Sequence, residues 1–345
     1  MTSEMPDLDQ LSGLTVDVIM PVYNGQEFIV KSLPPLMAMK RGGEVQEVIV
    51  VDDSSTDNSI EIAENLGATI LKTGGRLGPG GGRNQAVESS HSDILWFVDS
   101  DVVVHSDAVD HLKQGFDDPS VVAVFGSYDD QPPAENFLSQ YKNLVHHHYH
   151  NQGHSDASTF WAGCGAIRRK SFLESGGFDT RTYKRPSIED IELGYRLREA
   201  GGVIRLIPEL KSSHLKVWRL FNLIHTEVFC RAIPWSRLML TKTGIVDDLN
   251  VSSAERFKAG LAGLLLLSLV AALSGGVSWW WVLASTALAV WSNRTLFTLF
   301  FKRRGFLFAL SGLAFHQIYY LYSGFAFVYS WLEVRLFKTK NQPMA

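Results

Sequence analysis

The pattern of apolar and polar residues divides the chain into two parts. Up to about residue 215, short apolar runs alternate with stretches in which apolar residues recur at helical spacing. Residues 15–21, 48–51 and 94–98 are predicted to be buried strands, and residues 58–66 and 83–90 are predicted to be helices. Strands that alternate with helices indicate a parallel α/β sheet. The first part is therefore predicted to be one α/β domain.

The character of the chain changes after this domain. Between residues 216 and 240, aromatic and aliphatic residues are interleaved with basic residues such as Lys216, Arg219 and Arg231. This pattern predicts one or two amphipathic helices that lie at a membrane surface. An ordinary helix that packs on a core has the same periodicity, so this alternative stays open at the level of the sequence.

Three longer apolar segments follow, at residues 257–273, 277–291 and 306–332. A helix needs about 20 apolar residues to span a bilayer, so the first two are near the short limit and the third is ample. We expect three crossings, with the first two joined as a hairpin and the basic clusters at its two ends on the cytoplasmic side. A third crossing would carry basic C-terminal residues outside, so the orientation of the C-terminus stays open.

Polar residues interrupt these apolar segments. Asn293, Arg294, His316 and Gln317 lie where exposure to lipid would be costly. We therefore expect them to face other helices or the membrane interface.

The two halves of the pattern predict five regions along the chain. These are a disordered N-terminus at 1–14, the α/β domain at 15–215, interfacial amphipathic helices at 216–250, about three transmembrane helices at 251–335 and a basic tail at 336–345.

Composition and charge restrict the partners and the compartment. The net charge of −4 gives no reason to expect a nucleic acid. The two cysteines, Cys164 and Cys230, do not form a disulfide framework and fit a reducing compartment. Residues 1–14 are polar and acidic, unlike a secretory signal. Together with the apolar segments, these features predict an integral membrane protein, in a bacterial inner membrane, with the α/β domain in the cytoplasm.

The first candidate site is acidic. Asp99, Ser100 and Asp101 follow directly after the predicted strand at 94–98. In α/β sheets, ligands bind beyond the carboxyl ends of the strands. Two carboxylates at such an end can hold a hard cation such as Mg²⁺ or Mn²⁺ and leave coordination positions for phosphate oxygens. An isolated D-x-D is also common in surface turns, so the neighbouring motifs must be considered before a metal site is assigned.

That context is a series of motifs in a fixed order. Pro21-Val-Tyr-Asn24, then Asp52-Asp-Ser-Ser-Thr-Asp57, then a glycine-rich segment ending in Arg83-Asn84, precede the D-x-D, and Glu189-Asp190 follows it. In this order the chain resembles a family-2 glycosyltransferase with the GT-A (nucleotide-diphospho-sugar transferase) fold, over roughly residues 15–215. It departs from the family pattern in having glycines immediately before Arg83, which suggests a mobile loop or a close backbone approach.

The resemblance implies a nucleotide-sugar site. Pro21 and Tyr23 would border the base and Asp53 would hydrogen-bond to it, while Arg83 would approach the nucleotide or diphosphate and Ser100 the nucleotide sugar. Physically, a carboxylate can accept a hydrogen bond from a pyrimidine imide. Turn formation and helix capping are the simpler roles for Asp52 and Asp53.

The resemblance also implies the catalytic roles. Asp190 would be the general base of an inverting transfer, and Asp99 and Asp101 would hold the Mn²⁺ or Mg²⁺ that neutralises the departing diphosphate. His214 is a candidate metal or diphosphate contact, although a purely structural histidine is equally compatible with its position. Two carboxylates at the first turn of a helix are also favoured by the helix dipole, whatever their function.

The acceptor side is implied by a further segment. The small residue Gly163 and its neighbour Cys164, together with Glu189, would border the acceptor; a tight turn is the simpler explanation for the glycine. The predicted enzyme is a hexosyltransferase that moves a sugar from a nucleotide-diphosphate donor to a membrane lipid, such as a polyprenyl phosphate or glycolipid. A UDP-sugar is favoured over a GDP-sugar.

Two other functions stay open. Processive polysaccharide synthases resemble this chain in the core, but they carry Q-x-x-R-W where this chain has Glu227-Val-Phe-Cys-Arg231 with a displaced Trp235. A non-catalytic membrane protein that binds a nucleotide sugar is the third possibility, and the intact carboxylates argue against it.

Overall fold

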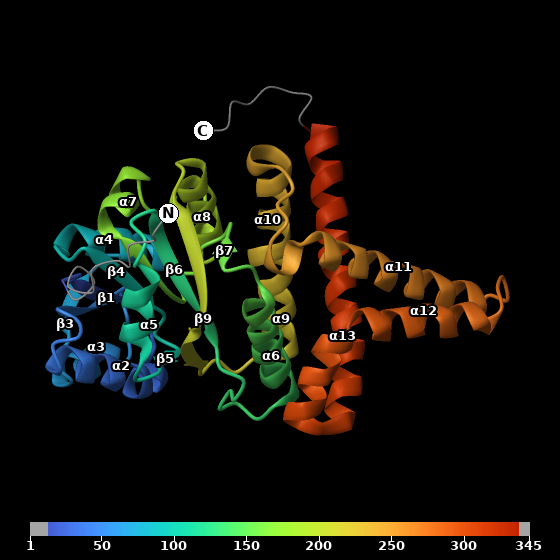
Figure 1. Ribbon diagram of the computed structural model, residues 1–345, viewed down its shortest axis with the longest axis horizontal. Coiled ribbons are helices and arrows are strands. Elements are labelled where there is room, and N and C mark those ends of the chain that lie inside the picture. The colour runs from blue at the N-terminus through green and yellow to red at the C-terminus, as the bar shows by residue number, and fades with distance from the viewer. Residues whose placement is uncertain (1–12, 338–345) are drawn as a thin grey trace, which may run out of the picture. The chain divides into compact units, whose positions relative to one another are not determined.

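The computed structural model describes residues 13–337 of the 345-residue chain. The predicted disordered N-terminus up to residue 12 and the basic tail from residue 338 lie outside the described residues. The described chain divides into two compact units. We call residues 13–135 with 150–217 the sheet unit, and residues 136–149 with 218–337 the helical unit (Figure 1).

The sheet unit is built on a sheet that has nine strands within the described residues. The strands are β1 (Val16–Val22), β2 (Glu47–Asp52), β3 (Thr69–Lys72), β4 (Ile94–Val98), β5 (Val102–Val104), β6 (Val121–Tyr128), β7 (Asp156–Ala157), β8 (Cys164–Arg168) and β9 (Val203–His214). Their order is β3-β2-β1-β4-β8-β6-β9-β5, with β7 paired to β9. The three strands predicted from apolar runs are confirmed as β1, β2 and β4.

The sheet is mixed: the part that contains the three predicted strands is parallel, as predicted, and antiparallel strands extend it. β1 pairs in parallel with β2 and β4, and β2 pairs in parallel with β3. β8 runs antiparallel to both β4 and β6. A parallel neighbour needs a crossover that returns the chain to the opposite edge. The chain instead enters β8 from the edge at which β4 ends, so β8 must run in the opposite direction.

This topology brings distant parts of the sequence to one edge of the sheet. The parallel strands β1, β2 and β4 end there, and the antiparallel β8 begins there. β6 is antiparallel to β8 and parallel to β9, so β9 also ends at this edge, at His214. The carboxyl-end edge of the sheet therefore collects residues from five segments of the chain.

Six helices belong to the sheet unit: α2 (Gln26–Arg41), α3 (Ser59–Asn65), α4 (Gly78–Ser89), α5 (Ala108–Gly115), α7 (Arg169–Glu174) and α8 (Glu189–Glu199), counted within the described residues. Every residue of β1 and β4 is buried, as expected for strands covered on both faces. The main core joins strand residues such as Val18 and Trp96 to Leu33 and Leu36 of α2.

The glycine-rich segment is part of a helix. It was predicted to be a loop before a helix starting at residue 83, but α4 already begins at Gly78. A Cβ atom at Gly82 would lie 3.2 Å from Cγ1 of Val51, and one at Gly80 would lie 3.4 Å from Cβ of Phe178. The glycines therefore allow the first turns of α4 to approach β2 and the loop after α7 closely.

The helical unit contains the second part of the pattern. Its helices are α6 (Phe137–Gln152, up to residue 149), α9 (Leu220–His225), α10 (Ile233–Leu238), α11 (Ser253–Leu273), α12 (Trp279–Ser292) and α13 (Arg294–Phe337). A π-helical segment, Thr226–Ala232, joins α9 to α10, and a second one, Met239–Thr243, extends the same helical run beyond α10. A short 3₁₀ turn, Leu249–Val251, precedes α11.

The helical run from residue 220 is amphipathic, as the sequence predicts. Leu223, Trp235 and Leu238 are buried, whereas Phe221 is 85% exposed and Phe229 is 61% exposed. Large apolar side chains are thus presented on the surface beside basic ones, which is the composition of an interfacial helix.

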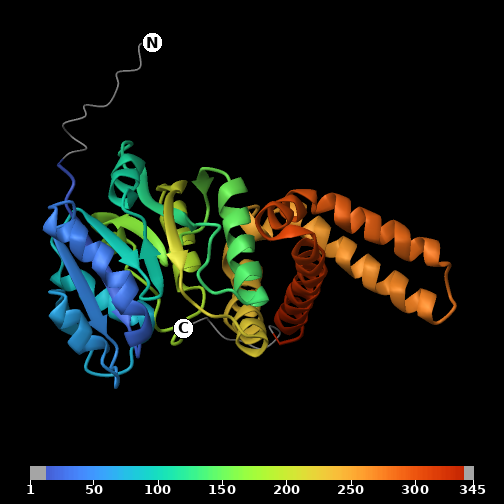
Figure 2. The same cartoon turned by 90° about the horizontal axis from the view of Figure 1, so that it is seen from below.

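The hairpin prediction is confirmed. Residues 274–278 form the turn between α11 and α12, and the two helices lie side by side (Figure 2). α13 is one long helical segment that is broken at Gly305, whose φ of 80° is outside the helical region.

Among the described helices, α11 alone is long and apolar enough to cross a membrane by length and composition, so the expectation of three such segments is not met. α12 has 14 residues, which gives a length of about 21 Å against a hydrocarbon core of about 30 Å. α13 is long enough, but its apolar part is diluted by tyrosines and by His316 and Gln317.

The polar residues of the apolar segments lie inside the helical unit. His316 is fully buried and its Nδ1 lies 2.8 Å from the hydroxyl of Tyr141. Asn293 is buried, and the hydroxyl of Tyr320 lies 2.9 Å from its Oδ1. The prediction that these two residues face other helices is confirmed. Gln317 is partly buried and donates to the carbonyl of Leu313 on its own helix.

Candidate active site

The D-x-D turn after β4 is fixed by backbone hydrogen bonds from two sides. The N–H of Asp99 donates to the carbonyl of Gly163 at 3.0 Å, which joins the turn to the segment before β8. The carbonyl of Asp101 accepts from the N–H of Leu215 at 2.8 Å, which joins it to the end of β9. The two carboxylates are therefore held at the carboxyl-end edge by main-chain bonds rather than left on a mobile loop.

Arg83 pairs with the first of these carboxylates. Its guanidinium is buried and makes a charged hydrogen bond to Asp99 Oδ1. The same guanidinium lies over the rings of Phe97 and Phe178, 5.9 Å and 5.5 Å from their centroids. Within the described residues its Nε has no hydrogen-bond partner. An unsatisfied buried N–H is costly, so this arrangement suits a site that receives an anionic ligand.

The second carboxylate lies beside the predicted histidine. His214 Nε2 is 3.4 Å from Asp101 Oδ2. Burial acts to raise the pKa of Asp101, but the charge of His214, the hydrogen bond to it and the charge of Lys216 outweigh burial and lower the pKa. Asp101 is therefore ionised at neutral pH.

Three negative charges meet around the D-x-D turn. Burial raises the pKa of Asp99, and the nearby carboxylates of Asp101 and Asp190 add to this effect against the opposing charge of Arg83. Such crowding of like charges is relieved when a cation binds between them.

The donor set of this cluster fits Mg²⁺ or Mn²⁺. Asp99 and Asp101 supply hard oxygen donors and His214 supplies an imidazole nitrogen, while phosphate oxygens of a substrate can complete the shell. In the part of the chain that the structure describes, no three His, Cys, Asp or Glu side chains are yet arranged as a metal-binding group.

Asp190 lies in the first turn of α8 with its carboxylate oriented by two peptide groups. Oδ2 accepts from the N–H of Ala162 at 3.1 Å, and Oδ1 accepts from the N–H of Ile191 at 2.9 Å. The residue is only partly buried. A partly exposed carboxylate with a fixed orientation is the arrangement that a general base requires.

Glu189 precedes it and is buried. Burial raises the pKa of Glu189 to about 7, and the charge of Asp190 adds to this effect against the opposing charge of Arg83. Its Oε2 accepts from the N–H of Ser187 at 2.8 Å. Near neutral pH, this side chain is therefore divided between its protonated and ionised forms.

The predicted nucleotide-binding residues lie at the ends of β1 and β2. Pro21 is buried inside β1, opposite Val51, and Tyr23 is 45% exposed just beyond the strand. Asp53 is buried, with Oδ1 accepting from the N–H of Leu77 at 2.7 Å and Oδ2 from that of Gly78 at 2.9 Å. Asp53 thus binds the start of α4 in this structure.

The turns after these strands are stabilised by their own side chains. Asp52 Oδ1 accepts from the N–H of Ser55 at 2.8 Å, so the turn role predicted for this residue is confirmed. Asn24 adopts a φ of 48°, and its Oδ1 accepts from the N–H of Thr56 at 2.7 Å. Asparagine tolerates this backbone region better than most residues. The bond joins the turn after β1 to the turn after β2.

The structure separates the three residues that were predicted on the acceptor side. Gly163 and Glu189 lie at the carboxyl-end edge. Cys164 is fully buried in β8, and burial raises the pKa of its thiol to about 12. The thiol of Cys164 therefore points into the core, and the assignment of these three residues to the acceptor side stays a prediction.

Comparison with known proteins identifies the sheet unit. Residues 17–176 match the family model described as glycosyl transferase family 2. These residues belong to glycosyl transferase family 2. The matched segment contains the turns after β1, β2 and β4, and α8 with Asp190 follows it in the same unit. Most of the match falls in the sheet unit, which continues beyond it to residue 217, and we use the name family 2 domain for this unit.

Three similar proteins illustrate the range of the match. A poly(ribitol-phosphate) beta-glucosyltransferase of Bacillus spizizenii is 34% identical over 103 residues, which are 28% of this chain and 16% of that protein. A poly-beta-1,6-N-acetyl-D-glucosamine synthase of Staphylococcus aureus is 27% identical over 222 residues, 60% of this chain and 51% of that protein. A mannosyltransferase from Pyrobaculum calidifontis, solved in complex with GDP-Man and Mn²⁺, is 18% identical with a TM-score of 0.47, covering 92% of this chain and 87% of that one. The chain thus spans about half or less of the two curated relatives.

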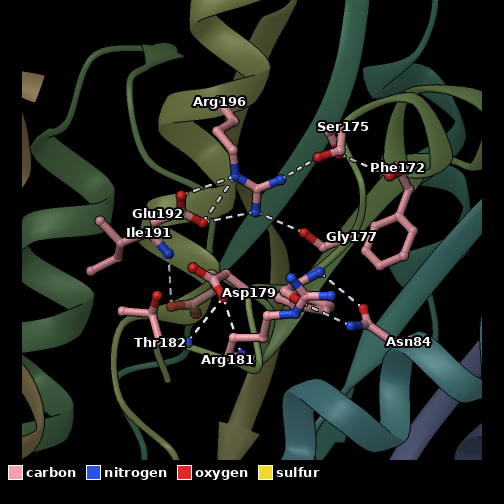
Figure 3. Close-up of polar contacts among 12 residues, drawn as sticks. Asn84, Phe172, Ser175, Gly177, Asp179, Arg181, Thr182, Ile191, Glu192 and Arg196 are labelled. Carbon is pink, nitrogen blue, oxygen red and sulfur yellow. Dashed lines mark hydrogen bonds and ion pairs between the residues drawn. The ribbon is translucent and has the colours of Figure 1, made fainter. Parts of the chain in front are cut away.

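Side chains outside the predicted set hold α8 in place in the family 2 domain. Arg196 donates to both oxygens of Glu192 and to the carbonyls of Ser175 and Gly177 (Figure 3). Glu192 is buried, so this bidentate pair is strong. It joins the helix that carries Asp190 to the loop after α7.

Asn84 holds the same loop from the other side. Its Nδ2 donates to the carbonyl of Phe178 at 2.8 Å, and its Oδ1 accepts from the N–H of Phe178 at 2.9 Å (Figure 3). Asn84 follows Arg83 in the sequence. Of the two neighbouring motif residues, Arg83 therefore contacts the D-x-D turn and Asn84 contacts this loop.

Two more residues of the family 2 domain lie at the predicted site but were not singled out from the sequence for these contacts. Arg76 stacks on Tyr23 and contacts Asp53, and Trp161 packs edge-on against Tyr128, whose ring stacks on His214. The glycine-rich context of Arg76 and the position of Trp161 before Gly163 were visible signals. The directions in which these two side chains point could not be predicted from the sequence.

Proposed function

We propose that the protein is an inverting, metal-dependent glycosyltransferase that moves a sugar from a nucleotide-diphosphate donor to a membrane lipid acceptor. The observation that carries the proposal is the meeting of Asp99, Asp101 and Asp190 at the carboxyl-end edge of a family 2 domain. The names of the two curated relatives support hexose or N-acetylhexosamine transfer, and hence a hexosyltransferase.

Asp190 is assigned the role of general base. In an inverting transfer, the acceptor oxygen forms a bond to the anomeric carbon as the bond from that carbon to the diphosphate oxygen breaks. The acceptor proton passes to one carboxylate, and the electron pair of the broken bond leaves with the diphosphate. Asp190 supports this role because two peptide N–H groups orient it and leave it partly exposed.

The leaving diphosphate is assigned to the D-x-D side of the cluster. Asp99 and Asp101, with His214 as a third candidate, would hold Mg²⁺ or Mn²⁺, which supplies charge neutralisation for the diphosphate when bound. Arg83 supports the same assignment, since its buried guanidinium has an N–H that an anionic ligand would satisfy. Ser100 lies between the two carboxylates and would meet the sugar or its phosphate.

The nucleoside is assigned to the ends of β1 and β2. Tyr23 offers a half-exposed ring, Pro21 supports it from the strand, and Asp53 offers a carboxylate. A carboxylate accepts but does not donate, so it recognises an N–H of the base. We favour a UDP-sugar over a GDP-sugar as the donor.

A membrane acceptor is supported by the helical unit. α11 is apolar enough to span a bilayer, and the tip of its hairpin carries Trp279, Trp280 and Trp281, all exposed. Tryptophans are enriched where a protein meets the membrane interface. We therefore propose an integral membrane protein of a bacterial inner membrane, with a catalytic domain at 15–215 in the cytoplasm, interfacial helices at 216–250 and membrane helices within 251–335.

A processive polysaccharide synthase is the second candidate. Similarity to the Staphylococcus aureus synthase over 222 residues favours it. Glu227 and Arg231 also form an ion pair at 3.5 Å, in the segment compared above with Q-x-x-R-W. Among the helices of residues 13–337, one meets the criteria for spanning a membrane, and this number is unfavourable for a polymer channel. Product length on a gel separates a single transfer from polymerisation.

The test is a transfer assay with the full-length protein in lipid nanodiscs. Labelled UDP- and GDP-sugars are offered with bacterial lipid extracts, with Mn²⁺, with Mg²⁺ and with a chelator. We expect a metal-dependent glycolipid and a loss of about 10²–10⁴ in kcat for Asp190→Asn. Asp110→Asn, on the exposed side of α5, is the matched control and keeps its activity. Full activity of Asp190→Asn would remove that residue from the role of base.

A further inference from the structure

Arg76 lies on the surface that the proposed function assigns to the nucleobase. Its guanidinium carbon is 3.3 Å from the centroid of the Tyr23 ring, and its Nε is 3.2 Å from Oδ2 of Asp53. The Arg76 side chain is 55% exposed. A planar group that stacks on an aromatic ring and donates an N–H to a carboxylate makes the two contacts expected of a bound base.

The other contacts of Asp53 come from two peptide groups and from the hydroxyl of Thr73, which lies 3.3 Å from Oδ1. Leu77 and Gly78 donate their N–H groups to Oδ1 and Oδ2 at 2.7 Å and 2.9 Å. These donors belong to the start of α4 and stay in place when a side chain moves. Arg76 is the flexible partner, because long exposed side chains lose little when they exchange one surface position for another. Asp53 therefore remains oriented and partnered if Arg76 leaves.

We propose that the guanidinium of Arg76 holds the place of the nucleobase in the ligand-free protein and is displaced when the donor binds. This inference rests on the proposed function, since it needs Tyr23 and Asp53 to form the base site. An N–H of the base replaces Nε–H at Oδ2 of Asp53, and the ring of the base replaces the guanidinium on Tyr23. Arg76 thus sets the affinity for the donor by competing with it.

The same geometry selects the base. Oδ2 accepts from the N–H of Gly78 and from Arg76, whereas Oδ1 accepts from the N–H of Leu77 and lies 3.3 Å from the hydroxyl of Thr73. Displacement of Arg76 therefore opens a position for one N–H donor at Oδ2 and none at Oδ1. Uracil presents a single imide N–H to such a position. Guanine presents an N–H and a neighbouring amino group, and its second donor would have to share Oδ1 with a peptide N–H that is already bonded. The site therefore favours uracil.

Titration calorimetry with uridine tests the proposal on the full-length protein. A nucleoside carries no phosphate, so the loss of a positive charge in the variant does not change an attraction for diphosphate. We expect Arg76→Ala to lower the Kd for uridine about three- to tenfold, the combined weight of an exposed cation–π contact and an exposed ion pair. Arg76→Lys keeps the charge but loses the planar stack. Its Kd for uridine is therefore expected to lie between that of the unaltered protein and that of Arg76→Ala.

The matched control is Arg41→Ala, which removes an exposed arginine at the end of α2, before β2 begins and hence at the opposite edge of the sheet. Its Kd for uridine should equal that of the unaltered protein. Guanosine should bind weakly to all four proteins.

A higher or unchanged Kd of Arg76→Ala for uridine would overturn the proposal, since the guanidinium would then help the bound base or stand apart from it. Asp53→Asn separates this failure from that of the proposed function. If Asp53→Asn binds uridine as tightly as the unaltered protein does, the base site itself is misassigned, whatever Arg76 does.

Discussion

The two units of this protein distribute polar and apolar side chains in opposite ways. In the sheet unit, the strands and the inner faces of the helices bury a continuous apolar core, and most charged residues lie on the surface or at the carboxyl-end edge. In the helical unit, leucines and tryptophans of α11 and α12 are exposed, whereas Glu255, Asn293 and His316 are buried. Such an inversion is expected where the surroundings are a bilayer rather than water.

The polar cluster of the helical unit shows what this inversion requires. Glu255 accepts hydrogen bonds from the hydroxyls of Tyr149 and Tyr320, both at 2.7 Å, and from Lys258. The cluster joins α6, α11 and α13 within the unit. Where apolar surfaces gain little from leaving lipid, hydrogen bonds of this kind are an important source of helix association.

The largest expected effect comes from breaking that cluster. Glu255→Ala would leave two buried hydroxyls and a mostly buried ammonium without their common acceptor. Removing one partner of a buried charged group costs about 3–5 kcal/mol. We expect a marked loss of folded protein in nanodiscs, measured by thermal unfolding, while nucleotide binding by the remaining folded fraction is unchanged. If the folded fraction of this variant also bound nucleotide more weakly, the expectation that the cluster does not affect the nucleotide site would be wrong.

A second comparison uses two exposed leucines. Leu267 is 68% exposed on α11 and Leu173 is 49% exposed on α7. A lysine at the centre of a membrane helix costs about 2.5–3.5 kcal/mol, whereas an exposed change on a soluble surface costs less than about 0.5 kcal/mol. We expect Leu267→Lys to lower membrane insertion and yield and Leu173→Lys to have no effect. The assay is flotation of membranes after expression, and equal flotation of both variants would argue against a lipid environment for α11.

The pH dependence of the sheet unit provides a smaller effect. Because burial raises the pKa of Glu189 to about 7 from an ordinary 4.5, the folded state holds this proton more tightly than the unfolded state does. The associated stability is present below pH about 4.5 and is lost as the pH rises through 7. Glu189→Gln mimics the protonated form, so its advantage should grow between pH 5 and pH 8 to roughly 3 kcal/mol.

Thermal unfolding of the sheet unit at pH 5, 6, 7 and 8 checks this expectation. Glu199→Gln removes an exposed carboxyl of the same helix and serves as the control. A constant difference between Glu189→Gln and the unaltered protein across this range would mean that Glu189 is not held in its protonated form by the fold.

The smallest expected effect concerns an ion pair in the helical unit. Arg237 donates to both oxygens of Glu333 at 2.7 Å and 2.8 Å, but both side chains are partly exposed. Solvent screening limits such pairs to about 0–1 kcal/mol. Glu333→Gln should therefore shift the thermal midpoint far less than Glu255→Ala. A comparable shift would show that this pair, too, is shielded from water.

Much of the fold was predictable because it depends on local patterns. The runs at β1, β2 and β4 are apolar throughout, as buried parallel strands require, and their boundaries agree with the prediction to within a residue or two. The antiparallel β8 was not predicted, since an apolar run carries no information about its direction. The helix start at Gly78 was missed because glycine is a poor helix former, and close packing against Val51 overrides that tendency.

The residues of the candidate site could also be predicted only in part. The position of Asp99 and Asp101 directly after an apolar strand singled them out, because ligands bind beyond the carboxyl ends of strands. Asp190, in the first turn of α8, was singled out by the family resemblance that the order of the motifs carries. The contact of Arg83 with Asp99 and that of Arg76 with Tyr23 depend on side chains that cross between segments. Sequence spacing does not specify where such long side chains point.

By itself, the sequence determined the family 2 domain, its strand-end carboxylates and the apolar character of the segments after residue 250, since each is written in local composition and order. The tertiary structure decided that Cys164 points into the core, that Asp53 is already bound by the start of α4 and that Glu255 gathers two tyrosines and a lysine. These outcomes depend on which surfaces meet when the chain packs. Packing joins residues far apart in the sequence, so no local pattern contains it.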